Sequence, residues 1–184
     1  MTGGLAEHVA LAEQLRGLLP AVDDAARAVV EAYARGGRVY TFGNGGSSTD
    51  AAHFAEELVG RFVRERRALP AQSLSVDAST LTCIANDYSY DEVFERQVRA
   101  FVRDGDVVIG FSTSGRSPNV VRGLAAARDL GATTVLFGGG SGGDASAHAD
   151  VALVVPSGST ARVQEMHVLL LHLILEQVDA WAAA

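Results

Sequence analysis

A histidine and a glutamate stand four residues apart in the stretch TDAAHFAEELVGRF, at His53 and Glu57. On a helix, residues at this spacing share one face. An imidazole and a carboxylate placed in this way can bind one metal ion, or act as the orienting group and the base of a proton transfer. The same spacing is common in ion pairs on solvated helix surfaces, so the pair by itself leaves both interpretations open.

Two further candidate ligands, Gln164 and His172, stand in the last predicted helix. His172 interrupts the apolar run VLLLHLIL, and the simplest interpretation of a histidine there is a core residue with satisfied hydrogen bonds. Gln164 and His172 are eight positions apart, which corresponds to about 12 Å along a helix axis. A single ion could take both side chains only with long side-chain reach, a bent first turn, or ligands from two chains.

Two loops rich in glycine and hydroxyl side chains follow predicted strands. GNGGSS (43–48) comes after RVYTF, and STSGRS (112–117) comes after DVVIGF. Free N–H groups and hydroxyls at a helix N-terminus bind anions. Neither loop is a dinucleotide fingerprint, because Ser48 stands where the third glycine belongs, and neither has the Gly-Lys-Ser/Thr of a P-loop. A hydroxyl-lined loop without a lysine suits the phosphate of a small metabolite, with simple helix capping as the alternative.

The elements that must position these groups alternate between strand and helix. Near-continuous apolar runs predict strands at residues 38–42, 71–76, 106–111, 132–137 and 150–155. Helical spacing predicts helices at 5–33 with a break at Pro20, 48–64, 79–102 with an interruption at 86–91, 118–130 and 161–181. The alternation predicts an α/β fold with a parallel sheet covered on both faces. Ligands bind at the carboxyl ends of such strands, where both loops lie.

Composition and charge narrow the class of protein. The 184 residues fit one domain, and 48% apolar residues are enough for a full core. A net charge of -7 argues against a nucleic-acid-binding surface. The single cysteine, Cys83, cannot form an intrachain disulfide, the first residues lack the features of a signal peptide, and no apolar run is long enough to span a bilayer. We therefore expect a cytoplasmic protein with no nucleic-acid or membrane partner.

Four segments together resemble the sugar isomerase (SIS) domain family and, within it, the phosphoheptose isomerases. They are GNGGSSTDAAHFAEELVGRF, ANDYSYDEVFERQV, GDVVIGFSTSGRSPNVV and RVQEMHVLLLH. The resemblance implies a single SIS domain over residues 1–184, folded as a flavodoxin-like three-layer αβα sandwich with a five-stranded parallel sheet and long terminal helices. It also implies an aldose–ketose isomerase that converts sedoheptulose 7-phosphate to D-glycero-D-manno-heptose 7-phosphate through an enediol.

The resemblance also implies roles for individual residues. The phosphate would be held by Ser112, Thr113, Ser114 and Ser117. Other substrate contacts would come from Asn44, Gly45, Gly46, Ser47, Glu57, Asn86, Asp87 and Gln164. One zinc ion per subunit would be bound by His53, Glu57, Gln164 and His172, with Glu57 and His172 as the catalytic base and acid.

The resemblance implies a homotetramer with active sites at subunit interfaces. Two features of the chain agree with it: the last helix is apolar on nearly all sides between Leu169 and Leu175, and the N-terminal segment has an apolar stripe with no place in a minimal doubly wound domain. We therefore expect the terminal helices, including residues 1–35, to pack between subunits, and each pocket to use residues of a neighbouring chain.

Two other functions compete with the enzyme. The chain also resembles the initiator-associating protein of bacterial replication, a non-enzymatic homotetramer that binds the replication initiator protein. That relative lacks the glutamate and histidine that match Glu57 and His172, so their presence here favours the isomerase. A sugar-phosphate-sensing domain is usually joined to a DNA-binding segment, and the chain shows no basic patch of that kind.

Overall fold

The computed structural model of the protein describes residues 3–184, and it contains one five-stranded sheet in which all strands are parallel. The strand order is β2-β1-β3-β4-β5. The strands are β1 (Val39–Gly43), β2 (Ala71–Ser73), β3 (Val107–Ser112), β4 (Thr133–Gly139) and β5 (Val151–Val155). This is the flavodoxin-like order, in which the chain reverses direction across the sheet between β1 and β3 and leaves a crevice at their carboxyl ends.

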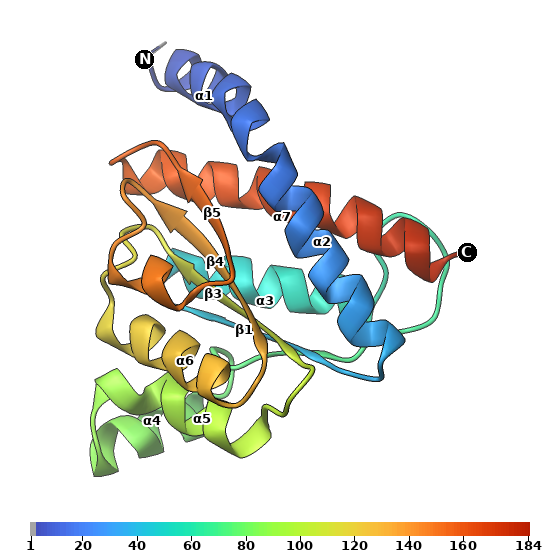
Figure 1. Ribbon diagram of the computed structural model, residues 1–184. Helices are drawn as coiled ribbons and strands as arrows, with labels where there is room; N and C mark the ends of the chain where they lie inside the picture. The colour runs from blue at the N-terminus through green and yellow to red at the C-terminus, as the bar shows by residue number, and fades with distance from the viewer. Residues whose placement is uncertain (1–2) are drawn as a thin grey trace.

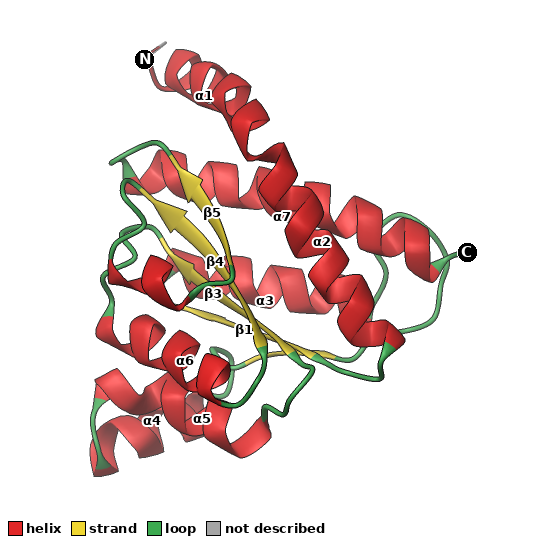
Figure 2. Cartoon of the chain, viewed as in Figure 1, coloured by secondary structure: helices red, strands yellow, loops and turns green. Residues whose placement is uncertain are grey.

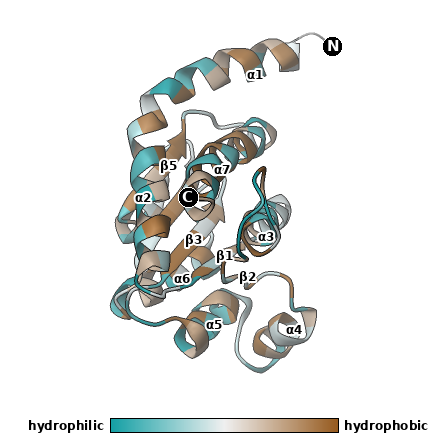
Figure 3. Cartoon of the chain, turned by 90° about the vertical axis from the view of Figure 1, so that its right-hand side faces the viewer, coloured by the Kyte–Doolittle hydropathy of each residue, from teal (hydrophilic) through white to brown (hydrophobic). Residues whose placement is uncertain are grey.

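Helices cover both faces of the sheet (Figures 1 and 2). One face is covered by α2 (Leu19–Ala34), α3 (Gly46–Val59) and α7 (Thr160–Ala182), and the other by α4 (Ala78–Asp87), α5 (Val93–Phe101) and α6 (Pro118–Asp129). The two layers are separated clearly in the side view of Figure 3. The remaining elements are α1 (Gly3–Gln14) and the short turns η1 (Leu15–Leu18), η2 (Tyr90–Glu92) and η3 (Asp144–His148). The predicted three-layer αβα sandwich is therefore confirmed.

The core consists of two apolar clusters, one on each face of the sheet. Successive side chains of a strand point to opposite faces of the sheet. In β3, one cluster therefore contains Val107, Ile109 and Phe111, and the other contains Val108. Both sets are fully buried, which explains why the strands are apolar without alternation. Each such side chain stabilises the fold by about 1.5–3 kcal/mol. The two loops at the carboxyl ends of β1 and β3 are therefore anchored to well-packed strands.

The helix predicted for residues 48–64 is shorter than expected, because α3 ends at Val59. The Arg66 guanidinium, which is buried, donates to the carbonyl oxygens of Glu57 (2.6 Å) and Leu58 (2.9 Å), and also to the Asp179 carboxylate (3.1 Å). Asp179 in turn accepts the backbone N–H of Arg64 at 2.8 Å. This buried ion pair ends the helix by capping its last carbonyls, and ties the end of α3 to α7.

The other boundaries differ by a few residues from those predicted. The N-terminal helix is broken as expected, but the break is the turn η1, and Pro20 lies in the first turn of α2. The predicted strand at 71–76 is only Ala71–Ser73, and the glycine-rich stretch at 138–149 contains η3. Over residues 3–184, none of the helices has both the length and the apolarity required to cross a membrane.

Candidate active site

The two glycine- and serine-rich loops lie next to each other at the crevice between β1 and β3. Gly43, the last residue of β1, pairs with Phe111 of β3, so the segments that follow leave the sheet side by side. Gly45 has a φ of 56°, a left-handed conformation that favours glycine, and α3 begins at the next residue. The second loop leads into α6, whose first residue is Pro118. Two helix N-termini therefore point their free N–H groups toward one crevice.

A small cavity of about 110 Å³ lies between these loops. It is lined by Asn44, Ser47, Phe111, Ser112, Thr113, Ser114 and Ser117. The Ser112 hydroxyl accepts the Gly115 N–H (3.1 Å), and the Ser114 hydroxyl accepts the Arg116 N–H (3.2 Å). Both hydroxyls can still donate a hydrogen bond, as an anion in the cavity requires. A larger cavity of about 630 Å³ lies at the amino ends of the strands and contains none of the predicted site residues.

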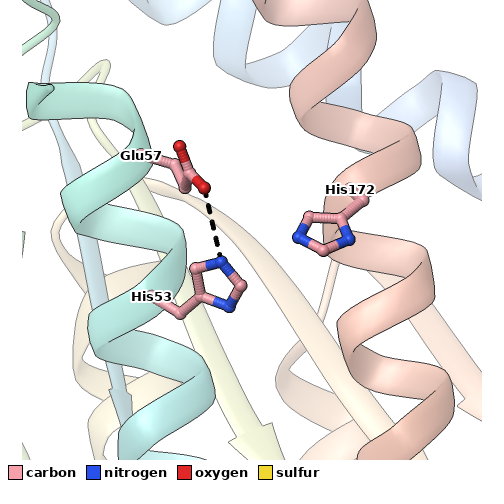
Figure 4. Close-up of side chains that lie close together, drawn as sticks. All are labelled: His53, Glu57 and His172. Carbon is pink, nitrogen blue, oxygen red and sulfur yellow. Dashed lines mark ion pairs between the residues drawn. The ribbon is translucent and has the colours of Figure 1, made fainter. Parts of the chain in front are cut away.

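Three of the predicted metal ligands meet in the groove between α3 and α7 (Figure 4). Nε2 of His53 lies 3.4 Å from Oε1 of Glu57, as the spacing of four residues predicts. The His172 ring lies 5.2 Å from the His53 ring, centroid to centroid, and each of the three residues offers a ligand atom within 4.8 Å of the others. All three side chains come from one chain and are half-buried.

Burial lowers the pKa of His172, and repulsion by His53 lowers it further, against a weaker opposing attraction by Glu57. The His172 ring also packs against Phe62, with 5.4 Å between the ring centroids. A neutral imidazole is therefore the favoured form near neutral pH. This form can donate a hydrogen bond through one nitrogen and accept a metal ion or a proton through the other.

Gln164 lies further along the same groove, against the first residue of α3. A side chain at position 46 would meet the end of the Gln164 side chain, so the Gln164 amide packs directly against Gly46. Gly46 is seven residues before His53, and Gln164 is eight before His172, so α3 and α7 run in parallel and present their polar residues in matching order. The helix α7 is continuous from Thr160 to Ala182. Gln164 therefore lies between the small cavity and the His/Glu cluster.

Asp50 is a buried carboxylate that the sequence analysis missed. It lies on α3 three residues before His53, and it lines a cavity of about 370 Å³ together with Gly46 and Gln164. The residue is 8% exposed, and its Oδ2 atom has no hydrogen-bond partner among residues 3–184. Burial raises the pKa of this carboxyl to about 6, against a smaller opposing effect of His53. The spacing of Asp50, His53 and Glu57 on one helix face was the signal available in the sequence.

Replacement of Asp50 by asparagine is expected to stabilise the fold at pH 7.5. Because the folded-state pKa of about 6 lies above the ordinary value of 3.8, the wild-type protein loses stability as pH rises from about 4 to 6. Asp50→Asn removes this loss, so its free energy of unfolding at pH 7.5 should be higher by about 1–3 kcal/mol, and the gain should vanish below pH 4. Urea denaturation at both pH values measures this, and an equal gain at both would contradict the prediction.

The Asn44 side chain is held by two residues that the sequence analysis also missed. Asn44 and Asn119, at the start of α6, exchange two amide hydrogen bonds of 2.9 Å each. The Tyr90 hydroxyl donates to Asn44 Oδ1 at 3.0 Å. Asn86 and Asp87, the predicted substrate contacts that end α4, are exposed, and the Asn86 amide donates to Asp87 at 2.8 Å. The short turn that carries Tyr90 follows them directly.

Comparisons with known proteins agree with this architecture. The SIS domain family matches residues 6–139. A phosphoheptose isomerase from Paramagnetospirillum magneticum is 52% identical over 157 residues, which are 85% of this chain and 82% of that protein. The structure of phosphoheptose isomerase GmhA from Neisseria gonorrhoeae matches with a TM-score of 0.92 and 38% identity, over 97% of this chain and 96% of that one. For a phosphoheptose isomerase from Francisella tularensis the TM-score is 0.84 with 36% identity, over 88% and 86% of the two chains. The chain therefore belongs to the SIS domain family and, within it, to the phosphoheptose isomerases.

Proposed function

We propose that the protein is an aldose–ketose isomerase that converts sedoheptulose 7-phosphate to D-glycero-D-manno-heptose 7-phosphate. The observation that carries this proposal is the convergence of Glu57 and His172 in one groove beside a hydroxyl-lined cavity. The three relatives compared above are named phosphoheptose isomerases. The initiator-binding alternative is not favoured, because this chain has both groups that an isomerase requires.

The phosphate of the substrate occupies the small cavity in this proposal. Ser112, Thr113, Ser114 and Ser117 donate to its oxygens, and the partial positive charge at the N-terminus of α6 favours its negative charge. The remaining substrate contacts are proposed for Asn44, Gly45, Gly46, Ser47, Asn86, Asp87 and Gln164. Binding energy from the phosphate is remote from the reacting carbons, so it can hold the sugar in the reactive geometry at Glu57.

Replacement of Ser114 by alanine is expected to weaken substrate binding. A hydrogen bond to a charged group contributes about 1.5–3 kcal/mol, so KM for the sugar phosphate should rise about tenfold or more, while kcat changes little. The matched control is Ser141→Ala, since Ser141 is an exposed serine of the glycine-rich loop outside the cavity. Wild-type activity on unphosphorylated sedoheptulose equal to that on the phosphate would remove the basis of this assignment.

The isomerisation needs one proton to leave C1 of the ketose and one to reach C2. The Glu57 carboxylate removes the C1 proton, and the electron pair forms the C1–C2 double bond of an enediol as the C2 carbonyl oxygen takes up a proton. Return of a proton to C2 and loss of the hydroxyl proton at C1 complete the aldehyde. His172, as a neutral imidazole, donates a hydrogen bond to the oxygen on which charge develops.

The donor set of the groove fits a zinc ion, one per subunit. Two imidazoles and a carboxylate lie within reach of one another, with no thiolate among them. His53, Glu57 and His172 would hold the ion, and we propose Gln164 as the fourth ligand. Because α7 is continuous, Gln164 would reach the ion through the length of its side chain or from a neighbouring chain. When bound, the ion would polarise the substrate carbonyl and stabilise negative charge on the adjacent oxygens.

We further propose that residues 1–184 form a single SIS domain, and that it works as a cytoplasmic homotetramer with active sites at subunit interfaces. The helix α1 supports this, because it projects from the body of the molecule (Figure 1) and leaves Leu5 71% exposed and Val9 56% exposed. Within residues 1–35, α2 is already buried against its own sheet, so α1 is the part that would pack between subunits and cover these side chains. His53, Glu57 and His172 meet within one chain. In the proposed tetramer, residues of a neighbouring subunit would line the rest of the pocket around them.

The test is to incubate the purified protein with sedoheptulose 7-phosphate and follow the mixture by NMR. The proposal predicts the signals of a new aldose phosphate, which grow until the two sugars reach equilibrium. A reaction started from the aldose phosphate should reach the same mixture. Absence of conversion with the metal-loaded protein would refute the proposed function.

A further inference from the structure

The side-chain oxygen of Asn44 is already saturated by contacts within the protein. A carboxamide oxygen has two lone pairs, and here one accepts the Asn119 amide (2.9 Å) and the other the Tyr90 hydroxyl (3.0 Å). The Asn44 amide nitrogen donates to Asn119 in return. A substrate hydroxyl therefore finds no free acceptor on Asn44. This side chain therefore joins protein segments to one another, and the second N–H of its amide is the group left to contact the sugar.

Tyr90 connects the segment that bears Asn86 and Asp87 to the first loop. Within residues 3–184, its hydroxyl makes the one side-chain hydrogen bond that links residues 78–92 to residues 43–48. The Tyr90 side chain is 57% exposed, so burial of the ring does little to hold it. The helix α4 buries only Ile84 completely, with Leu81 and Ala85 partly buried against the same cluster, so this segment has less core packing than α5 or α6.

We propose that Tyr90 is a positioning residue, which fixes Asn86 and Asp87 relative to the phosphate cavity through the side chain of Asn44. The connection is continuous: Asn119 begins α6 beside the cavity, Asn44 lines the cavity, and Tyr90 follows Asp87 by three residues. A sugar phosphate that contacts both the cavity and Asn86–Asp87 requires a fixed distance between them. This inference rests on the proposed function for its substrate, but the link itself is a property of the free protein.

The chain offers a matched control for this proposal in Tyr88. Tyr88 lies in the same segment and is 56% exposed, but its ring stacks with the Arg96 guanidinium at 3.7 Å and its hydroxyl has no partner among the described residues. Tyr90→Phe and Tyr88→Phe each remove one oxygen atom and keep the ring. The two variants therefore differ only in whether the lost hydroxyl bonds Asn44.

The experiment measures amide hydrogen exchange and steady-state kinetics for both variants. Loss of one hydrogen bond should speed exchange in residues 78–92 by about two- to tenfold in Tyr90→Phe, and leave it unchanged in Tyr88→Phe. KM for sedoheptulose 7-phosphate should rise by a similar factor in Tyr90→Phe only, with kcat within about twofold of wild type.

Three results would overturn the proposal. Unchanged exchange in Tyr90→Phe would show that the hydroxyl does not hold the segment. Faster exchange with an unchanged KM would make the hydrogen bond purely structural. A large loss of kcat with unchanged exchange would place the hydroxyl in the reaction itself. If the wild-type protein converts no sedoheptulose 7-phosphate, the proposed function fails, and the exchange measurement still decides whether Tyr90 fixes the segment.

Discussion

Glu57→Gln is expected to lower kcat by at least about 1000-fold while the fold and the substrate affinity are retained. The amide has nearly the same shape as the carboxylate, but it cannot accept a proton from carbon. Glu57 is placed for this role by α3, which directs its side chain into the groove toward His53 and His172 (Figure 4). Steady-state kinetics with sedoheptulose 7-phosphate, together with circular dichroism to confirm folding, measure the effect.

The neighbouring residue supplies the control for this substitution. Glu56 has the same chemistry, lies on the same helix and is exposed to solvent. Glu56→Gln should therefore retain kcat within about twofold, since surface substitutions of this kind change little. Near-wild-type turnover of Glu57→Gln would show that another group removes the proton, and the proposed mechanism would be wrong.

Removal of the metal is expected to abolish activity, and added zinc to restore it. Three half-buried donors with ligand atoms within 4.8 Å of one another fit the donor set of a zinc site. Metal analysis should give one zinc ion per chain. His53→Asn and His172→Asn should each weaken zinc binding by at least about 100-fold, which equilibrium dialysis measures without reference to activity.

His148→Asn is the matched control for the metal prediction. His148 ends the turn η3, which packs on the face of the sheet opposite the His/Glu groove, and should bind no part of the ion. Its zinc content should therefore equal that of the wild type. Full activity after exhaustive chelation, with no metal detected, would leave His53 and Gln164 as structural or substrate-orienting residues.

The fold could be predicted from the sequence because strands of a parallel sheet are buried on both faces and therefore appear in the sequence as continuous apolar runs. All five strands and the two loops at their carboxyl ends were located in this way, and the shared rim followed from the geometry of parallel sheets. The end of α3 was not predictable, since it depends on Arg66 and Asp179, which are 113 residues apart in the sequence and meet only after folding. Helix boundaries set by tertiary ion pairs leave no local signal.

The candidate site was predictable where its residues follow helical periodicity. The positions of His53 and Glu57 required only the spacing of four residues. The contact of His172 with them required knowledge that α7 packs beside α3, which periodicity does not give. The same limit applies to Asn119 and Tyr90, which reach Asn44 across 75 and 46 residues of sequence. Asp50 differs, because its place on the His53 face was visible in the sequence.

In the proposed reaction, the protein moves a carbonyl between C1 and C2 by proton transfer through Glu57. The most direct test is to react the protein with sedoheptulose 7-phosphate in heavy water until equilibrium, and to locate deuterium in both sugars by NMR and mass spectrometry. Proton transfer through Glu57 predicts an aldose phosphate with deuterium at C2 and recovered ketose with deuterium at C1, from the wild type but not from Glu57→Gln. Conversion with no deuterium in either sugar after many turnovers would indicate hydride transfer between the carbons and would contradict proton transfer through Glu57, as would recovery of unlabelled ketose alone.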